Sequence, residues 1–305
     1  IIKAELSYSM HGQAGRLDVE LLQDELVNYA EGSQVSLKAN EDNLFYGYLF
    51  TKGIKENENV TITCYDQLRY LRNKDTYVLK EMTSGQIVEK LCKDFNLKYK
   101  VIDDASRKIS PRIHDNKTLY EIIDYGLTEI LVNDGQWLII RDNNGTLEQV
   151  DVETLKSNIV IGDESLLTAY DYESSIDKDT FNQVKLVREN EETEKREVYI
   201  VKDSSTINKW GVLQYFEHVD ERVEEDWIEE RCEAILRLKN RPSKRLRIKA
   251  IGHLGVREGV GVVISIEALK TADNVQEGHY IVESVKHRFE DELHTMDLEV
   301  ISYER

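Results

Sequence analysis

The first 75 residues alternate apolar and polar side chains with a period of two, which is typical of half-buried β-strands. Gly, Asn and Asp separate the runs, as expected for turns between antiparallel strands. A short connector follows, with Leu68 and Leu71 on one side if it is helical. We therefore predict that residues 1–75 form an antiparallel sheet curled into a small barrel. The four runs are 15–22, 32–39, 44–53 and 58–65.

The period changes in residues 76–151, where two segments carry apolar side chains at helical spacing. Thr83 or Ser84 is suited to cap the first. A hairpin follows around Asn144 and Gly145, a favoured pair for a tight turn. These elements predict a compact α/β module, interpreted as a structural insert with peptidoglycan binding as the alternative. The helices are 83–96, with Ile87, Leu91 and Phe95 on one face, and 117–131, with Leu119, Ile122, Ile123 and Leu127.

Strands return from about Ile159, and residues 152–305 are predicted to form a second barrel with a helical insertion at about 204–241. A hairpin over 184–201 has an acidic tip, 189–194, interpreted as a solvated loop because it lacks calcium-loop spacing. A helix after Asp220 ends before Pro242, which cannot continue it. Its apolar face predicts core packing, or a subunit contact if the tryptophan is exposed: Val223, Trp227, Ile228, Ile235 and Leu236.

Composition narrows the class of protein. The 305 residues carry 58 acidic and 40 basic side chains, a net charge of −18, which disfavours nucleic-acid binding because phosphate contacts need clustered bases. Three widely spaced cysteines predict buried thiols rather than a disulfide framework or a zinc site. Apolar runs are too short to cross a bilayer, and the first residues lack the pattern of a secretion signal. We expect a soluble protein.

Chemistry-bearing motifs are scarce. There is no HExxH, nucleophile elbow or phosphate loop, and 255–261 (GVREGVG) precedes a strand, so it predicts a turn. His287 and His294 could be neighbours in a hairpin that pairs His287 with Met296 and Phe289 with His294. We therefore predict no catalytic residues, no cofactor and no metal site.

The order of motifs resembles the XkdQ/YqbQ-type tail proteins of Bacillus prophage elements and of contractile bacteriocins. It is more distantly similar to the late control protein D family and the hub portion of VgrG spikes. The resemblance spans about residues 12–300. It rests on LFYGYLF with Gly47, on CYDQLRYL with Asp66, Leu68 and Leu71, on TFNQVKLV with Asn182, on KWGVLQ with Gly211, on KNRP with Pro242, on LRIKAIGHLGVREGVGV with Gly252 and Gly259, and on the last segment with His287.

This resemblance implies two tail-tube-like antiparallel β-barrel domains, a mainly β fold with the α/β module between them. It also implies a structural, non-enzymatic baseplate hub: a homotrimeric ring that joins a sixfold tail tube to a threefold spike. Expected partners are the tube protein, the spike, other baseplate proteins and a LysM-containing tail protein. Such a protein is made in the bacterial cytoplasm and assembled into a virion tail or bacteriocin particle. The alternatives are a peptidoglycan-binding tail module and a cell-wall hydrolase.

The acidic charge adds a hypothesis about the bore of such a ring. Acids that line it would repel DNA phosphates and prevent adhesion. Alternatively, the acids only solvate the outer surface.

Overall fold

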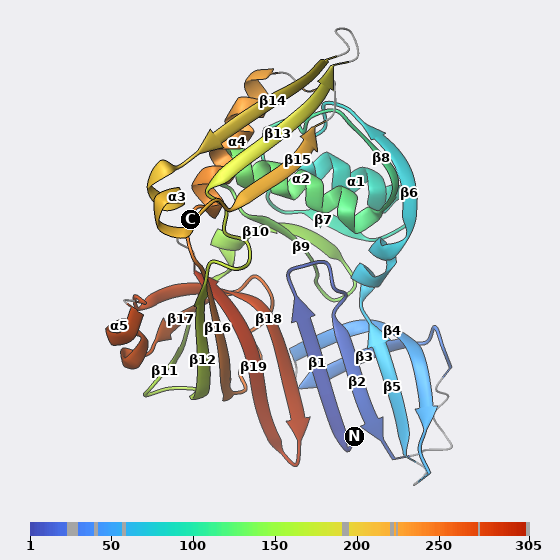
Figure 1. Ribbon diagram of the computed structural model, residues 1–305. Helices are drawn as coiled ribbons and strands as arrows, with labels where there is room; N and C mark the ends of the chain where they lie inside the picture. The colour runs from blue at the N-terminus through green and yellow to red at the C-terminus, as the bar shows by residue number, and fades with distance from the viewer. Residues whose placement is uncertain are drawn as a thin grey trace.

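Strands from both ends of the chain build one large sheet (Figure 1). The computed structural model describes residues 1–22, 30–39, 42–56, 59–190, 195–219, 223, 225–273 and 275–302. Each strand along the path is antiparallel to its neighbour. In spatial order the path is β3 (Gln34–Ala39), β4 (Asp42–Ile54), β5 (Val60–Tyr65), β2 (Arg16–Leu21), β1 (Lys3–Ser9), β18 (Gly278–Glu290), β19 (Leu293–Ser302), β16 (Ser243–Ile251) and β12 (Leu167–Ser175).

The middle of this sheet joins the first strand of the chain to one of the last. β1 pairs with β18, with Lys3 opposite Glu290 and Ser9 opposite Ser284. The first part of β18 instead pairs with β17 (Gly261–Ser265), which pairs in parallel with β11 (Lys156–Gly162). The sheet therefore divides at β18.

The predicted mainly β class is confirmed, but the strands are not closed into two barrels. β3 and β12 end the strand path, and no pairing between them occurs among the described residues. Alternation shows that a strand has one buried face but not which strand lies beside it. β1 pairs with β18 as well as β2, so strands expected in separate barrels share one sheet. The domain limits at residues 75 and 152 stay predictions.

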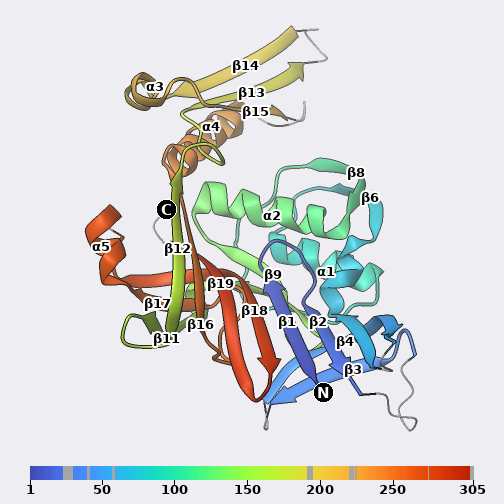
Figure 2. The same cartoon turned by 60° about the horizontal axis from the view of Figure 1, so that its bottom comes forward.

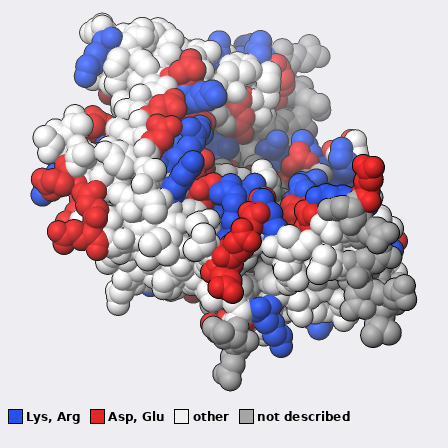
Figure 3. Space-filling model, turned by 90° about the horizontal axis from the view of Figure 1, so that it is seen from below, with Lys and Arg blue, Asp and Glu red and all other residues white. Residues whose placement is uncertain are grey.

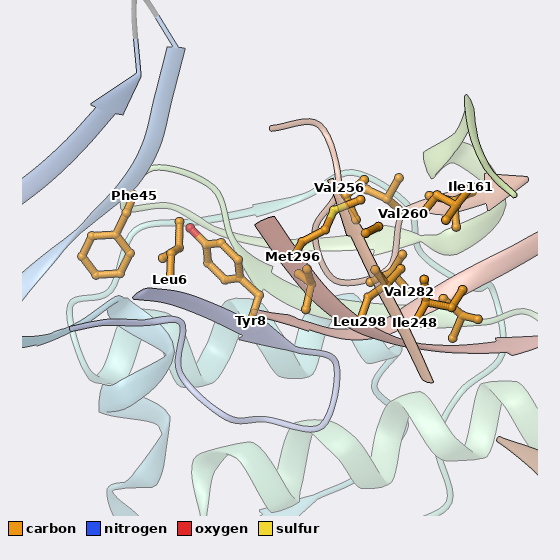
Figure 4. Close-up of a cluster of buried hydrophobic side chains, with 14 of the residues drawn as sticks. Leu6, Tyr8, Phe45, Ile161, Ile248, Val256, Val260, Val282, Met296 and Leu298 are labelled. Carbon is orange, nitrogen blue, oxygen red and sulfur yellow. The ribbon is translucent and has the colours of Figure 1, made fainter. Parts of the chain in front are cut away.

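One face of the sheet is apolar and the other is charged. In β1, Leu6 and Tyr8 are buried, whereas Glu5 and Ser7 line the opposite face. Figure 4 shows that the buried side chains come from both halves of the path, Phe45 beside β1 and Leu298 from β19. The same core includes Ile161, Ile248, Val256, Val260, Val282 and Met296.

The predicted α/β module lies above the main sheet in Figure 1, and both helices form as expected. Thr83 caps α1 (Ser84–Asp94) and Thr118 caps α2 (Leu119–Asp134), each in a capping box. Asn144 and Gly145 both have positive φ in the tight turn between β9 and β10. The module's strands are β6 (Lys74–Leu79), β7 (Tyr99–Val101), β8 (Arg112–Thr118), β9 (Leu138–Asp142) and β10 (Leu147–Asp151), after which a short 3-10 helix, η2, spans Val152–Leu155.

Between β12 and β16 the chain leaves the main sheet and forms a second, small sheet (Figure 2). We call the described residues of 181–240 the lobe. The excursion is wider than the predicted helical insertion, because the hairpin strands leave the main sheet as well. The helix before Pro242 packs Ile228 and Ile235 into the lobe core, with Trp227 partly buried against it. The elements are β13 (Gln183–Asn190), β14 (Lys195–Lys202), α3 (Ser204–Trp210), β15 (Gln214–Val219) and α4 (Glu225–Lys239).

Cys64, Cys92 and Cys232 are buried free thiols, as expected. In the acidic tip, residues 191–194 lie outside the described part of the chain. A last short helix, α5 (Glu267–Asp273), follows β17. No helix in the described ranges combines the length and apolar character needed to traverse a bilayer.

Candidate assembly surfaces

Three of the motif residues lie in the connector between β5 and the module. Asp66 caps η1 (Gln67–Arg72): its Oδ1 accepts a hydrogen bond from Leu68 N–H at 3.0 Å and its Oδ2 accepts one from Gly15 N–H at 2.8 Å. Leu68 and Leu71 are buried in the module core. The connector therefore ties the module to the turn before β2. Gly47, in β4, is required for a different reason, because a Cβ there would lie 2.2 Å from the carbonyl oxygen of Tyr65.

Asn182 and Gly211 are brought together in the lobe. The Asn182 Nδ2 donates to the Gly211 carbonyl and its Oδ1 accepts from Leu213 N–H, both at 2.8 Å. Gly211 follows α3 with a φ of 79°, a value that favours glycine. The buried Asn182 thus fixes the turn from α3 into β15, and Pro242 follows α4 where the chain returns to the main sheet.

The predicted register is confirmed: His287 lies opposite Met296 and Phe289 opposite His294, and the two histidine rings nevertheless meet diagonally across the hairpin. The ring nitrogens His287 Nδ1 and His294 Nε2 lie 3.0 Å apart, and His287 Nε2 lies 2.8 Å from the Val256 carbonyl. A carbonyl only accepts, so His287 donates from Nε2, and in the neutral ring its Nδ1 accepts from His294 Nε2. Burial lowers the pKa of His287 to about 4, in keeping with this. A Cβ on Gly252 would meet the His294 ring at 2.1 Å.

Gly259 belongs to a buried polar cluster that sequence reasoning missed. Its φ is 79°, and the two residues before it, Arg257 and Glu258, enter the space between the main sheet and the module. The Arg257 Nη2 donates to Glu258 Oε1 at 2.7 Å and to the Asp142 carbonyl at 2.6 Å, and its guanidinium lies 4.7 Å from the centre of the Tyr8 ring. The signal was present in GVREGVG, but a turn motif does not indicate which side chains are buried.

We call this cluster, with the neighbouring carboxyl groups of Asp66 and Asp142, the junction. The pKa values of both carboxyl groups are raised there. Burial raises the pKa of Asp66 well above its usual range, with Asp142 and Glu258 adding to the shift, and burial raises the pKa of Asp142 to about 6. For Arg257, burial opposes the charge, but Glu258 raises the pKa above its ordinary value. The junction holds β1, η1, β9 and the loop before β17 together, so it positions the module on the sheet.

The polar face of the main sheet forms a groove of about 1280 Å³. Oppositely charged side chains form ion pairs within the groove, such as Arg288–Asp297 at 2.5 Å and Arg16–Asp18 at 2.7 Å. Figure 3 shows Lys and Arg gathered with Asp and Glu across the middle of the view from below. Seven basic and six acidic residues line the groove: Arg16, Arg72, Arg245, Arg247, Lys249, Lys286 and Arg288, with Glu5, Asp18, Asp171, Glu283, Asp297 and Glu299.

Two further surfaces belong to the same sheet. β3 and β12 each pair on one side only among the described strands, so both present backbone groups available for pairing. Five large apolar residues, each more than half exposed, lie by strand register at the same end of the sheet as the turn between β18 and β19. We call them the apolar rim: Ile1, Leu22, Ile54, Ile251 and Leu293.

The chain belongs to the YQBQ-like family, whose model matches residues 4–301. It is 30% identical over 281 residues to the phage-like element PBSX protein XkdQ of Bacillus subtilis, an alignment that covers 89% of this chain and 82% of that one. The fold is similar to the 43 kDa tail protein of prophage MuSo2 from Shewanella oneidensis, with a TM-score of 0.72, 13% identity, and coverage of 99% and 94%.

A further structural likeness is to the E. coli c3393 protein, described as a type VI secretion component similar to the bacteriophage T4 tail proteins gp27 and gp5. The TM-score is 0.57 at 10% identity, and the match covers 100% of this chain and 74% of that one. The chain is thus similar to phage tail and related secretion proteins, which agrees with the resemblance found in the sequence.

Proposed function

We propose that copies of this chain form a homotrimeric ring that acts as the hub of a phage tail baseplate, between the tail tube and the spike. The observation that carries the proposal is the strand path of the main sheet, which ends at each side in a strand that pairs on one edge only among the described residues, β3 and β12. A heterologous contact between two different edges generates a closed ring if the rotation between copies closes. The family and the tail proteins of similar fold support this role.

In this arrangement the groove lines the central bore of the ring. It is nearly balanced in charge, although the whole chain has 18 more acidic than basic residues. The acidic excess therefore lies outside the groove, so in this arrangement we propose the alternative in which the acids solvate the outer surface, while an acidic lining that repels DNA stays an untested hypothesis. Paired charges that satisfy one another would instead give a passing polyanion no continuous patch to bind.

The apolar rim supplies an end-on contact. Its residues lie at the same end of the strands as the turn between β18 and β19, and Figure 1 shows this turn on the side away from the α/β module. Exposed apolar residues along one end of a sheet are candidates for a protein interface. We propose that the rim contacts the neighbouring ring of the particle, tube or spike. The proposal assigns the chain a structural role and no catalytic step.

Cross-linking tests the ring. Ser36→Cys in β3 and Glu173→Cys in β12 put one thiol on each exposed edge, while the three native thiols are buried. In assembled particles, a short bismaleimide should give dimers and then trimers as the largest product. A matched pair, Ser36→Cys with Glu229→Cys on the exposed face of α4, should stay monomeric. Equal cross-linking in both pairs, or none in the edge pair, would sink the proposal.

A further inference from the structure

The outer face of the lobe sheet is unusually apolar for a solvent-facing surface. Alternate residues of β13 and β15 point inward, where Val184, Leu186 and Tyr215 pack on α4. The opposite face carries Ile200 beside Lys185 and Phe216 in one register, and Val198 beside Val187 and His218 in the next; Val187 itself is buried. Val198, Ile200 and Phe216 are each about half exposed. A small sheet with one face in a core normally has a polar second face.

The charges on this face are mostly basic. Lys185 and Lys202 flank Ile200, and neither has a carboxylate partner in the described residues. The one described acid on the face is Glu189, which lies 3.4 Å from Arg196 in an ion pair. The outer face therefore combines an apolar centre with positive charge, in a chain whose net charge is −18.

We propose that the outer face of the lobe sheet is a docking site for an acidic protein segment with apolar side chains. The apolar part would cover Val198, Ile200 and Phe216, and its carboxylates would meet Lys185 and Lys202. The segment lies on the face rather than extending the sheet, because lysine on an edge strand such as β14 discourages strand addition. A second copy of this chain is the competing occupant. The site is separate from the edges, groove and apolar rim, so it stands whether or not the ring proposal holds.

A peptide probe tests the chemistry with the full chain. A short peptide of alternating Asp and Leu should bind and lose affinity as salt rises, while a peptide of alternating Lys and Leu should not bind. Lys185→Glu with Lys202→Glu should weaken binding about tenfold or more, as should Ile200→Ser with Phe216→Ser. The matched control Lys98→Glu with Lys100→Glu, on exposed positions of the module, should bind like the wild type.

Thermal unfolding of each variant separates loss of the site from loss of the lobe, because these substitutions are on the outer face and should leave the melting curve close to wild type. Equal binding of both peptides, or binding unaffected by the face variants, would overturn the proposal. So would concentration-dependent dimers in sedimentation that the Ile200→Ser, Phe216→Ser variant abolishes, since these would assign the face to a second copy.

Discussion

The α/β module is held by two buried charged contacts that are built differently. At the junction with the main sheet, Asp66 and Asp142 accept hydrogen bonds from backbone N–H groups, those of Gly15, Leu68 and Gly145. At the contact with the lobe, Arg231 of α4 bridges Glu129 of α2 and Glu217 of β15.

The difference concerns what replaces water around a buried carboxylate. Backbone N–H donors remain in place when a neighbouring side chain is changed. At the junction they donate to carboxyl groups whose pKa is raised by burial. The Glu129 carboxylate depends on the Arg231 guanidinium, and burial still raises the pKa of Glu129 to about 7. The lobe contact should therefore fail with one substitution, whereas the Asp66 and Asp142 carboxyl groups of the junction should respond mainly to pH.

The largest effect should come from Arg231→Ala. Removing one partner of a buried ion pair leaves an uncompensated group and costs about 3–5 kcal/mol. Hydrogen exchange should rise in β13, β15 and α4 while the main sheet stays protected. Arg237→Ala, at an exposed position of the same helix, is the control and should change little. Equal loss of protection in the lobe and the main sheet would contradict the contrast.

The next effect is a pH dependence at the junction. The folded pKa of Asp142 is about 6, above the ordinary value of 3.8, so the folded chain holds the proton more tightly. Its contribution to stability is full below about pH 4, falls as pH rises towards 6, and is then constant. Asp142→Asn should remove this fall, on the order of 3 kcal/mol across the window.

Urea unfolding of wild type and Asp142→Asn from pH 4 to pH 7 measures this effect. The comparison is the difference between the two proteins, because His287, whose pKa is depressed to about 4, contributes stability that is lost as pH falls below its ordinary value of 6.5. Asp171→Asn, at an exposed position, should give a much smaller difference. A flat difference for Asp142→Asn would show that the carboxyl stays ionised in the fold.

A smaller effect should follow from Asn182→Ala. The change leaves the Gly211 carbonyl and the Leu213 N–H without their side-chain partner, at a cost of about 2 kcal/mol. Chemical denaturation followed at Trp210, beside this turn, should detect it. Gln183→Ala removes only an exposed side-chain pair and should be close to neutral. Similar losses in the two variants would remove the special role of Asn182.

The smallest effect concerns the helix caps. Thr118→Ala should cost about 1 kcal/mol through loss of the hydrogen bond from the Glu121 N–H. Thr83→Ala should cost about the same in α1. α2 touches the lobe through Glu129, so hydrogen exchange in α4 should increase with Thr118→Ala but not with Thr83→Ala. Increased exchange in α4 with both variants would mean that the module transmits any loosening equally.

Local features of the fold could be predicted because neighbouring residues determine them. The cap at Thr83, the turn at Asn144 and Gly145, and the register of His287 with Met296 follow from short-range patterns. The pairing of β1 with β18 could not be predicted, because alternation identifies a buried face but not a distant partner.

The candidate surfaces divide in the same way. The sequence suggested a hub through resemblance, and Asn182 and Gly211 do meet in the structure. The balance of charge in the groove could not be foreseen, since it depends on which acids of an acidic chain share a face with Arg245 and Arg288. The sequence gives no sign that Arg231 is buried, because a basic residue in a charged helix usually faces solvent.

The pairing of β1 with β18 also has a consequence for how the chain is made. Synthesis runs from the N-terminus, so β1, β2, β4 and β5 emerge long before β18 can pair with them. The module has local helices and its own core, but β1 keeps an open edge until residues 278–290 leave the ribosome. A nascent chain halted before β18 would expose the open edge of β1. This edge could pair with strands of other nascent chains translated from the same mRNA.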